Sequence, residues 1–180
     1  GSVIKPQVGV DLDVHSPASV NRPLLDNNKG VALAVGILPH YGDIDFRHMA
    51  AASIDTAIRN VVSVGADPSR IALLDNFCWA SSNEPERLYQ LKEAAKACYD
   101  YAIAYGTPFI SGKDSMFNDF KGFDENDQPV KISVPPTLLI SSIGLVQDVT
   151  TCVTLDAKRT GDLVYVIGQT HNELGAGEYY

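Results

Sequence analysis

The chain has 180 residues, of which 45% are hydrophobic and 20% are charged, so it is long enough for one large globular domain or for one domain and part of a second. Its 14 Lys and Arg against 22 Asp and Glu give a net charge of -8, and basic residues nowhere cluster with aromatics, which argues against nucleic acid as a partner. No apolar run is long enough to cross a membrane and the amino terminus has no signal-peptide pattern, so we expect no membrane association.

The three cysteines, Cys78, Cys98 and Cys152, lie far apart in the sequence and are odd in number. This spacing predicts neither a disulfide framework nor a zinc site, and it favours a reducing, cytoplasmic setting. Residues 1–2, Gly-Ser, are typical of what an expression tag leaves behind, and we set them aside.

The amino-terminal part of the chain predicts two strands. Residues 8–14 alternate between apolar and other side chains, which is typical of a strand with one buried face. After a break at residues 15–17 and a polar turn at 26–30, the apolar run at 31–35 predicts a strand buried on both faces. We expect the two strands to be neighbours.

Apolar residues at helical spacing predict a helix from Phe46 to Val64, ended by Gly65, with Asn60 near its carboxyl end. The short apolar strand that follows at 71–74 carries Asp75 at its carboxyl end. In α/β architectures this end of a strand is where ligands gather.

The clearest helix runs from Asn83, the expected N-cap, to Gly106, with Glu86 placed to complete a capping box. One apolar stripe follows the predicted helix, and Cys98 on it is interpreted as a small core residue. The stripe consists of Leu88, Leu91, Ala95, Cys98, Ala102 and Tyr105.

Small, charged and hydroxyl residues crowd into the segment 111–118, Ser-Gly-Lys-Asp-Ser-Met-Phe-Asn, after the apolar run 108–110. Gly112 lets backbone N–H groups approach an anion, Lys113 supplies a compact positive charge, and a hydroxyl adds a directional hydrogen bond. The segment lacks the spaced first glycine of a Walker loop. Its residues therefore predict either a phosphate-binding loop at a strand end or a solvated polar turn.

The acidic loop at 123–128 lies between two predicted strands and lacks the fixed glycine and terminal glutamate of a calcium loop, so we interpret it as a solvated turn. Further strands are predicted at 130–134, 138–146, 149–153 and 163–168. We place a domain boundary near Asp148, which assigns 3–147 to a first domain. Residues 148–180, which end inside the glycine-rich loop 171–178, are expected to be the incomplete start of a second.

The order of these elements predicts an α+β fold, an α/β sandwich in which Asn60, Asp75 and residues 112–115 converge. Each polar feature alone is weak evidence, because Asn often caps helices and Asp often forms turns. Three such features together favour a binding site, for which a nucleotide phosphate with its metal is the natural ligand.

Several segments together resemble phosphoribosylformylglycinamidine synthase (FGAM synthase), and more specifically the second of its two repeated halves. The family belongs with aminoimidazole ribonucleotide synthetase, selenophosphate synthetase and thiamine-phosphate kinase. The resemblance covers nearly the whole chain from about residue 22, and it is carried by residues 54–60, 64–68, 73–77, 112–116, 136–137, 143–144 and 172–178.

This resemblance implies a mixed β-sheet with helices on one face, like the amino-terminal domain of aminoimidazole ribonucleotide synthetase. It implies a C–N ligase that uses ATP and magnesium to convert formylglycinamide ribonucleotide to formylglycinamidine ribonucleotide in de novo purine biosynthesis. Ammonia comes from glutamine through a glutaminase domain or subunit. A further expected partner is the other half of the enzyme or a second copy of the chain, and the fragment alone is expected to be inactive.

Matched position by position, the resemblance places Asp75 and Gly112 at nucleotide contacts and Ser115 at a substrate contact. Lys113 matches large members of the family, and we expect it to touch a phosphate or to pair with a carboxylate such as Asp75. Asn60 matches a metal-site position. No residue matches a catalytic position, and none of the four histidines is assigned to catalysis.

Two departures from the family pattern leave an alternative open. Thr56 and Pro17 stand where the resemblance implies a Glu and an Asp of the metal site. Without those carboxylates, the domain is expected to be a structural or interaction module with a degenerate nucleotide site. A third interpretation, another kinase or synthetase of the superfamily, is disfavoured by residues 112–116 and 74–77.

Overall fold

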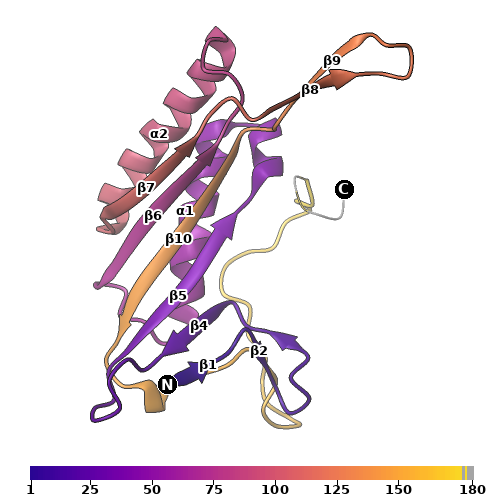
Figure 1. The fold of residues 1–180 in the computed structure, drawn as a ribbon. Coiled ribbons are helices and arrows are strands. Elements are labelled where there is room, and N and C mark those ends of the chain that lie inside the picture. The colour runs from indigo at the N-terminus through magenta and orange to yellow at the C-terminus, as the bar shows by residue number, and fades with distance from the viewer. Residues whose placement is uncertain (176, 178–180) are drawn as a thin grey trace.

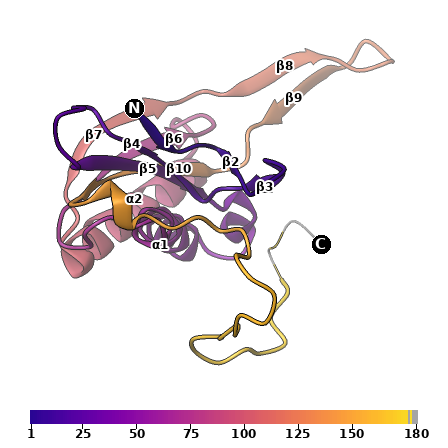
Figure 2. The same cartoon turned by 90° about the horizontal axis from the view of Figure 1, so that it is seen from below.

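The computed structural model describes residues 1–175 and 177, and its centre is one mixed six-stranded sheet with both α-helices on the same face (Figure 1, Figure 2). The strand order is β1-β4-β5-β10-β6-β7, and every neighbouring pair is antiparallel except the parallel pair β6 and β7. This arrangement confirms the predicted α+β class. The strands are β1 (Ser2–Ile4), β4 (Ala18–Asn21), β5 (Gly30–Ile37), β10 (Thr137–Val146), β6 (Ile71–Cys78) and β7 (Phe109–Ser115).

Two small antiparallel sheets lie outside this main sheet. One pairs β2 (Gln7–Val8) with β3 (Val14–His15), and the other pairs β8 (Asp119–Phe123) with β9 (Pro129–Ser133). The prediction of one strand over 8–14 is therefore wrong, because the chain reverses between β2 and β3. Gly9 and Leu12 have φ values of 89° and 55° there, which end an extended strand.

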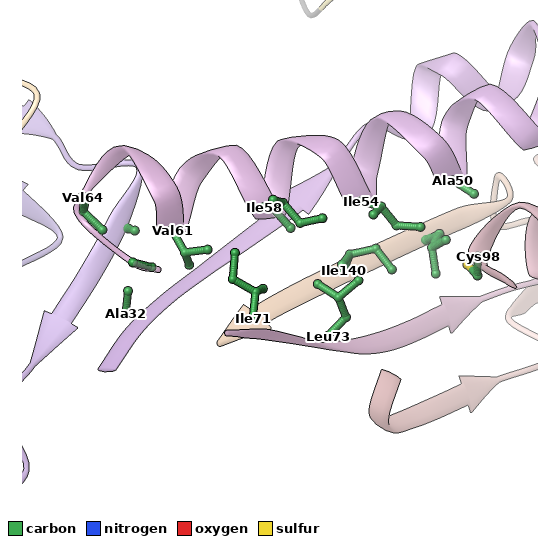
Figure 3. Close-up of a cluster of buried hydrophobic side chains, with 14 of the residues drawn as sticks. Ala32, Ala50, Ile54, Ile58, Val61, Val64, Ile71, Leu73, Cys98 and Ile140 are labelled. Atoms are coloured by element: carbon green, nitrogen blue, oxygen red, sulfur yellow. The ribbon is translucent and has the colours of Figure 1, made fainter. Parts of the chain in front are cut away.

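Helix α1 (Phe46–Ser63) confirms the helix predicted from Phe46 to Val64, and it follows the short helix η1 (Pro39–Asp43). Asp45 is the N-cap, and its carboxylate accepts a hydrogen bond from the His48 N–H at 2.8 Å. The buried side of α1 lies on β5 and β10 (Figure 3). Its fully or almost fully buried residues include Ala50, Ile54, Ile58 and Val61.

A close approach of backbone to backbone fixes the distance between α1 and β5. A Cβ atom added to Gly36 would lie 2.1 Å from the carbonyl oxygen of Ser53. One strand further on, the buried Ser142 Oγ donates a hydrogen bond of 2.7 Å to the Ala57 carbonyl. Glycine on β5 and serine on β10 thus let α1 rest close to the sheet.

Helix α2 (Pro85–Tyr105) connects β6 to the parallel β7, as a parallel pair requires. Its N-cap is Glu84 rather than Asn83, and no side chain caps it. Gly106 ends the helix at a φ of 68°, where its N–H bonds to the Ala102 and Ile103 carbonyls.

The predicted apolar stripe of α2 is only partly correct. Leu88 and Tyr105 are exposed, whereas the residues buried on this helix are Gln90, Ala94, Ala97 and Cys98. Three of these four buried residues are small, because α2 packs on α1 as well as on the sheet, whereas the larger Leu91 and Tyr101 are only partly buried against the core. The interpretation of Cys98 as a core residue is confirmed.

The strand predicted at 31–35 exists as part of β5, but it is buried on one face only, and its neighbours are β4 and β10. Leu33, Val35 and Ile37 are 44%, 51% and 43% exposed, because both helices lie on the opposite face. We call this surface the open face, with Leu145 of β10 adjoining it.

Beyond β10 the structure differs from the predictions. Residues 149–151 form the short helix η2 (Val149–Thr151), and the strands predicted at 149–153 and 163–168 are not formed. Ile167 is fully exposed, so this apolar segment lacks the neighbour that would make it a strand. The boundary near Asp148 stays a prediction, and Ala176 and Glu178 of the predicted glycine-rich loop lie outside the described residues.

Adding a methyl group at Gly36 is expected to destabilise the fold. The Gly36→Ala variant must push α1 away from β5, and overpacking of this kind costs about 1–3 kcal/mol. Urea denaturation should show a lower midpoint than for the parent chain. Gly175→Ala is the matched control, because its Cβ meets no atom within 4 Å, and equal midpoints for the two variants would contradict the argument.

Candidate functional site

Four of the five predicted site residues lie on the parallel strands β6 and β7, which run side by side (Figure 1). Asp75 is paired in register with Gly112, Asn76 with Lys113, and Cys78 with Ser115. The segment from Ser111 to Ser115 is therefore part of edge strand β7, and the prediction of a loop at a strand end is wrong. Pairing with β6 extends the strand through these polar residues, and Asp75 likewise lies inside β6 rather than at its end.

Alternation along the two strands sorts the site residues onto opposite faces of the sheet. Asp75, Gly112 and Asp114 belong to the face that carries the helices, on which the Asp75 partner in β10 is the buried Ile140. Lys113 and Ser115 belong to the open face. The site is thus divided by the edge strand rather than gathered on one side of it.

The Asp75 carboxylate lies directly over Gly112. A Cβ atom at position 112 would be 2.3 Å from Asp75 Oδ1, so only glycine leaves room for the carboxylate in this position. The spacing of the two residues in the sequence does not indicate this contact, because it depends on the register of a parallel pair. The role of Gly112 is therefore to leave space for the Asp75 carboxylate. The sequence had instead predicted that this glycine lets backbone N–H groups approach an anion.

Partial burial raises the pKa of Asp75, and the nearby charge of Asp114 raises it further, while the Lys113 backbone N–H opposes the shift by hydrogen bonding. On α2, burial raises the pKa of Cys98 to about 12, and the charge of Asp75 contributes to that rise. Asp75 therefore lies between the edge of the sheet and α2. A carboxylate held in this way readily accepts a hydrogen bond from a ligand's hydroxyl or amino group.

Lys113 is exposed on the other face, next to Asn76 in the strand register. Within the part of the chain that the structure describes, no ion pair joins Lys113 to Asp75, so the suggested pairing of the two is not formed. Asn76 Oδ1 is buried and lacks a hydrogen-bond partner in the same described part. The ammonium of Lys113 remains available to an anion on the open face.

Asn118 holds Ser115, and sequence reasoning gave it no role. Its Nδ2 donates to the Ser115 carbonyl at 2.7 Å and to Ser115 Oγ at 3.1 Å. The same Ser115 carbonyl accepts from the N–H of Trp79, a fully buried residue beyond the end of β6. The sequence feature that could have indicated this role is the location of Asn118 in the polar segment 111–118, at the turn where the chain leaves the sheet.

Asn60 does not join this group. Its Nδ2 donates to the Val35 carbonyl of β5 at 3.0 Å, and β10 lies between β5 and β6. Asp55, one turn earlier on α1, pairs with Arg59 and accepts a hydrogen bond from the Tyr105 hydroxyl at 2.6 Å. Residues 1–175 and 177 contain no group of three or more His, Cys, Asp or Glu that could hold a metal ion, so the donors among these residues do not by themselves fit a magnesium site.

No helix among the described residues is long and apolar enough to span a membrane.

The comparisons with known proteins identify the family to which this chain belongs. Residues 16–146 match the family model described as "AIR synthase related protein, N-terminal domain", so the chain belongs to that family. Its relatives include the phosphoribosylformylglycinamidine synthase subunits PurL of Methanothermobacter marburgensis and Lacticaseibacillus paracasei. The chain is 37% identical to the first over 155 residues and 31% identical to the second over 163 residues.

These alignments cover 86% and 91% of the chain, but only 20% of either relative, so the chain spans about a fifth of their length. Among solved structures, Thermotoga maritima PurL complexed with ATP superposes with a TM-score of 0.64 at 20% sequence identity. That match covers 84% of this chain and 22% of the other, and it supports the fold described above.

Removing the Asp114 charge is expected to lower the pKa of Asp75, because a like charge beside a carboxyl favours its protonated form. The Asp114→Asn variant should show this in a ¹³C NMR titration of the Asp75 carboxyl. A raised folded-state pKa costs stability as the pH rises above the unfolded value, so the variant should also be more stable at neutral pH. Asp26→Asn, in an exposed loop, is the control, and an unchanged Asp75 titration in Asp114→Asn would contradict the assignment.

Proposed function

We propose that this chain is the amino-terminal domain of the second half of an FGAM synthase, and that it contributes nucleotide- and substrate-facing residues to that enzyme. The observation that carries the proposal is the Asp75–Gly112 contact on strands β6 and β7, found in a chain whose relatives are named phosphoribosylformylglycinamidine synthase. Solved structures of Thermotoga maritima PurL hold ATP in one case and FGAR in another. The proposed setting is the cytoplasm.

In the proposed reaction, ATP activates the amide oxygen of formylglycinamide ribonucleotide, and ammonia released from glutamine elsewhere displaces phosphate. Asp75 accepts a hydrogen bond from the nucleotide, and Gly112 leaves its carboxylate the space to do so. Across the edge strand, Ser115 contacts the ribonucleotide in the orientation that Asn118 fixes. Lys113 shares that face, where its charge can stabilise a phosphate at the meeting point of nucleotide and substrate.

Magnesium belongs to this proposal only in combination with other parts of the protein. Asn60 has an amide oxygen to offer, but Thr56 and Pro17 supply no carboxylate, and the described residues form no metal-binding group. Neutralising a transferring phosphoryl group requires such an ion. The remaining ligands would come from the nucleotide phosphates or from domains that this chain does not include.

The proposed partners follow from the open face. Leu33, Val35, Ile37 and Leu145 expose aliphatic side chains on one side of the sheet, and an uncovered patch of this kind marks a binding surface. We propose that it packs on a domain of the same fold, either the other half of the enzyme or a second copy. A structure described as "PurLQS" from Thermotoga maritima supports additional subunits, among which we place the glutaminase.

A second candidate function is a structural domain of the same family with a degenerate nucleotide site. The lack of a metal-binding group among the described residues favours it. The two candidates differ in nucleotide binding. Calorimetric titration of the chain with ADP, with and without magnesium, should give heat if the site works within the chain. No heat leaves a degenerate site or a site that a missing domain completes, and the same titration of a longer chain separates these two.

Removing the Lys113 charge should weaken phosphate binding while the fold remains intact. In the full-length protein, Lys113→Met is expected to lower ATP or ribonucleotide affinity by about tenfold or more, since a hydrogen bond to a charged group contributes about 1.5–3 kcal/mol. Calorimetry measures the affinity and circular dichroism checks the fold. Lys92→Met on exposed α2 is the control, and equal affinity in Lys113→Met and the parent would refute the phosphate role.

The chain alone is expected to produce no formylglycinamidine ribonucleotide. It spans about a fifth of its relatives, and the proposed metal ligands and ammonia source lie elsewhere. An assay of phosphate release with ATP, formylglycinamide ribonucleotide and ammonia tests this. The full-length protein is the positive control; turnover by the isolated chain would show that the site is complete within it.

A further inference from the structure

Helix α2 lies at the margin of the helix layer and is apolar on two sides (Figure 1, Figure 2). Its inner side packs on α1 and the core through Ala94, Ala97 and Cys98. Its outer side leaves four large side chains 52% to 67% exposed, and these are Leu88, Tyr89, Tyr99 and Ile103. A helix that is apolar on both sides is typical of one that is buried on both sides. The described chain covers only the inner side, so the outer side offers a surface for a further contact.

Two lysines lie among these exposed apolar residues. Steps of three or four residues lead from Leu88 through Lys92 and Lys96 to Tyr99 and Ile103, and such steps keep side chains on one face of a helix. Both lysines are exposed, and neither forms an ion pair within residues 1–175 and 177. We call this surface the outer α2 face. It consists of Leu88, Tyr89, Lys92, Lys96, Tyr99 and Ile103.

The acidic residues of α2 lie on the side toward α1 instead. Glu93 and Asp100 both pair with Arg47 of α1, and the distance from Arg47 Nη2 to Asp100 Oδ2 is 2.7 Å. Glu86 precedes Glu93 by two helical turns and therefore lies on the same side. The outer α2 face thus keeps two positive charges, although the net charge of the chain is -8.

The mixture of apolar and basic residues defines the chemistry of a partner. A contact that covers Tyr99 and Ile103 also removes the neighbouring Lys92 and Lys96 from water. Burying an ammonium group is costly unless a carboxylate pairs with it. A fitting partner therefore presents apolar side chains together with Asp or Glu.

We propose that the outer α2 face binds an acidic segment in the part of the full-length protein that lies outside these 180 residues. Apolar side chains of that segment pack on Tyr99 and Ile103, and its carboxylates pair with Lys92 and Lys96. This chain spans only 20% of the Methanothermobacter marburgensis relative. In a protein of that length the segment is tethered to α2, which raises its effective concentration above that of a separate acidic protein. The contact does not depend on the ligand residues of β6 and β7.

A second copy of the chain does not fit this surface. In a two-fold contact the same surface meets itself, so Lys92 and Lys96 of one copy would face those of the other. Like charges repel in such a contact, and no carboxylate of the outer α2 face could pair with them. An anionic membrane does not fit either, because lipid recognition takes clusters of about four to eight Lys or Arg.

Cross-linking of the full-length protein with a carbodiimide tests the contact, because this reagent joins an amine to a carboxylate only where the two are paired. Mass spectrometry should find Lys92 or Lys96 joined to an Asp or Glu outside residues 1–180. Lys131 is the internal positive control. Its amine already hydrogen bonds to Glu84, so this pair should cross-link in every sample.

Removing one apolar side chain of the outer α2 face should weaken the contact. Tyr99→Gln keeps helix propensity but removes the ring, and it should lower the yield of the Lys92 and Lys96 cross-links about tenfold. Phe123→Thr is the matched control, because it removes a ring that is 73% exposed on the β8–β9 hairpin, and it should leave that yield unchanged. Circular dichroism should show both variants folded.

Mixing ¹⁴N- and ¹⁵N-labelled protein shows whether a cross-link joins one polypeptide or two copies. Cross-links of Lys92 or Lys96 that join two copies would overturn the proposal. It is also wrong if neither lysine cross-links beyond residue 180 or before residue 1 while Lys131 is joined to Glu84. Full yield in Tyr99→Gln would show that the apolar residues of the outer α2 face take no part, which contradicts the proposed contact.

Discussion

Both helices lie on one face of the six-stranded sheet, and this arrangement determines which side chains of the sheet are buried and which are exposed. Gly36 and Ser142 let α1 come close enough to bury Ile54 and Val61 against β5 and β10. The same strands place aliphatic side chains on the other face, where no helix follows. A sheet built in this way has a core on one side and exposed aliphatic side chains on the other, and this is the physical basis for proposing that another domain packs on it.

The candidate site depends on the one parallel pair in that sheet. A parallel connection needs a crossover, and α2 provides it, which brings β7 beside β6 with Gly112 at Asp75. Because β7 is an edge strand, its two faces and its free edge are all accessible. Asp75 and Lys113, which are close in the register, can therefore act on different parts of one ligand, or on two ligands that meet around the edge.

Sequence reasoning identified the elements with a strong local signal. The helix from Phe46 and the strands of the β8–β9 hairpin were predicted because periodicity and turn residues act over a few positions. It failed where the outcome depends on distant partners. The run at 31–35 reads as doubly buried, and only the location of both helices on the opposite face explains why Leu33 and Val35 are exposed. Likewise the segment 163–168 has the composition of a strand but lacks a neighbour in this chain.

The sequence predicted that the candidate site residues come together, which holds for four of the five, but it did not predict their geometry. Asp75, Gly112, Lys113 and Ser115 do lie together on β6 and β7, whereas Asn60 is held by the Val35 carbonyl two strands away from β6. No local pattern indicates the contact of Asp75 with Gly112 or the hold of Asn118 on Ser115, because both depend on where a strand pairs and where it ends.

The two faces of the sheet at β6 and β7 carry opposite charges. Asp75 and Asp114 place negative charge on the face of β6 and β7 that carries the helices. A polyanionic ligand is repelled there unless a cation accompanies it. Lys113 lies on the open side. In the proposed function its charge attracts the phosphates of a nucleotide, while the nucleotide's hydroxyl or amino groups bind to Asp75. The open face is also the one that we propose a neighbouring domain covers. A ligand bound at this edge would then be enclosed between two domains, and a single layer of sheet and helices could take part in chemistry that must exclude water.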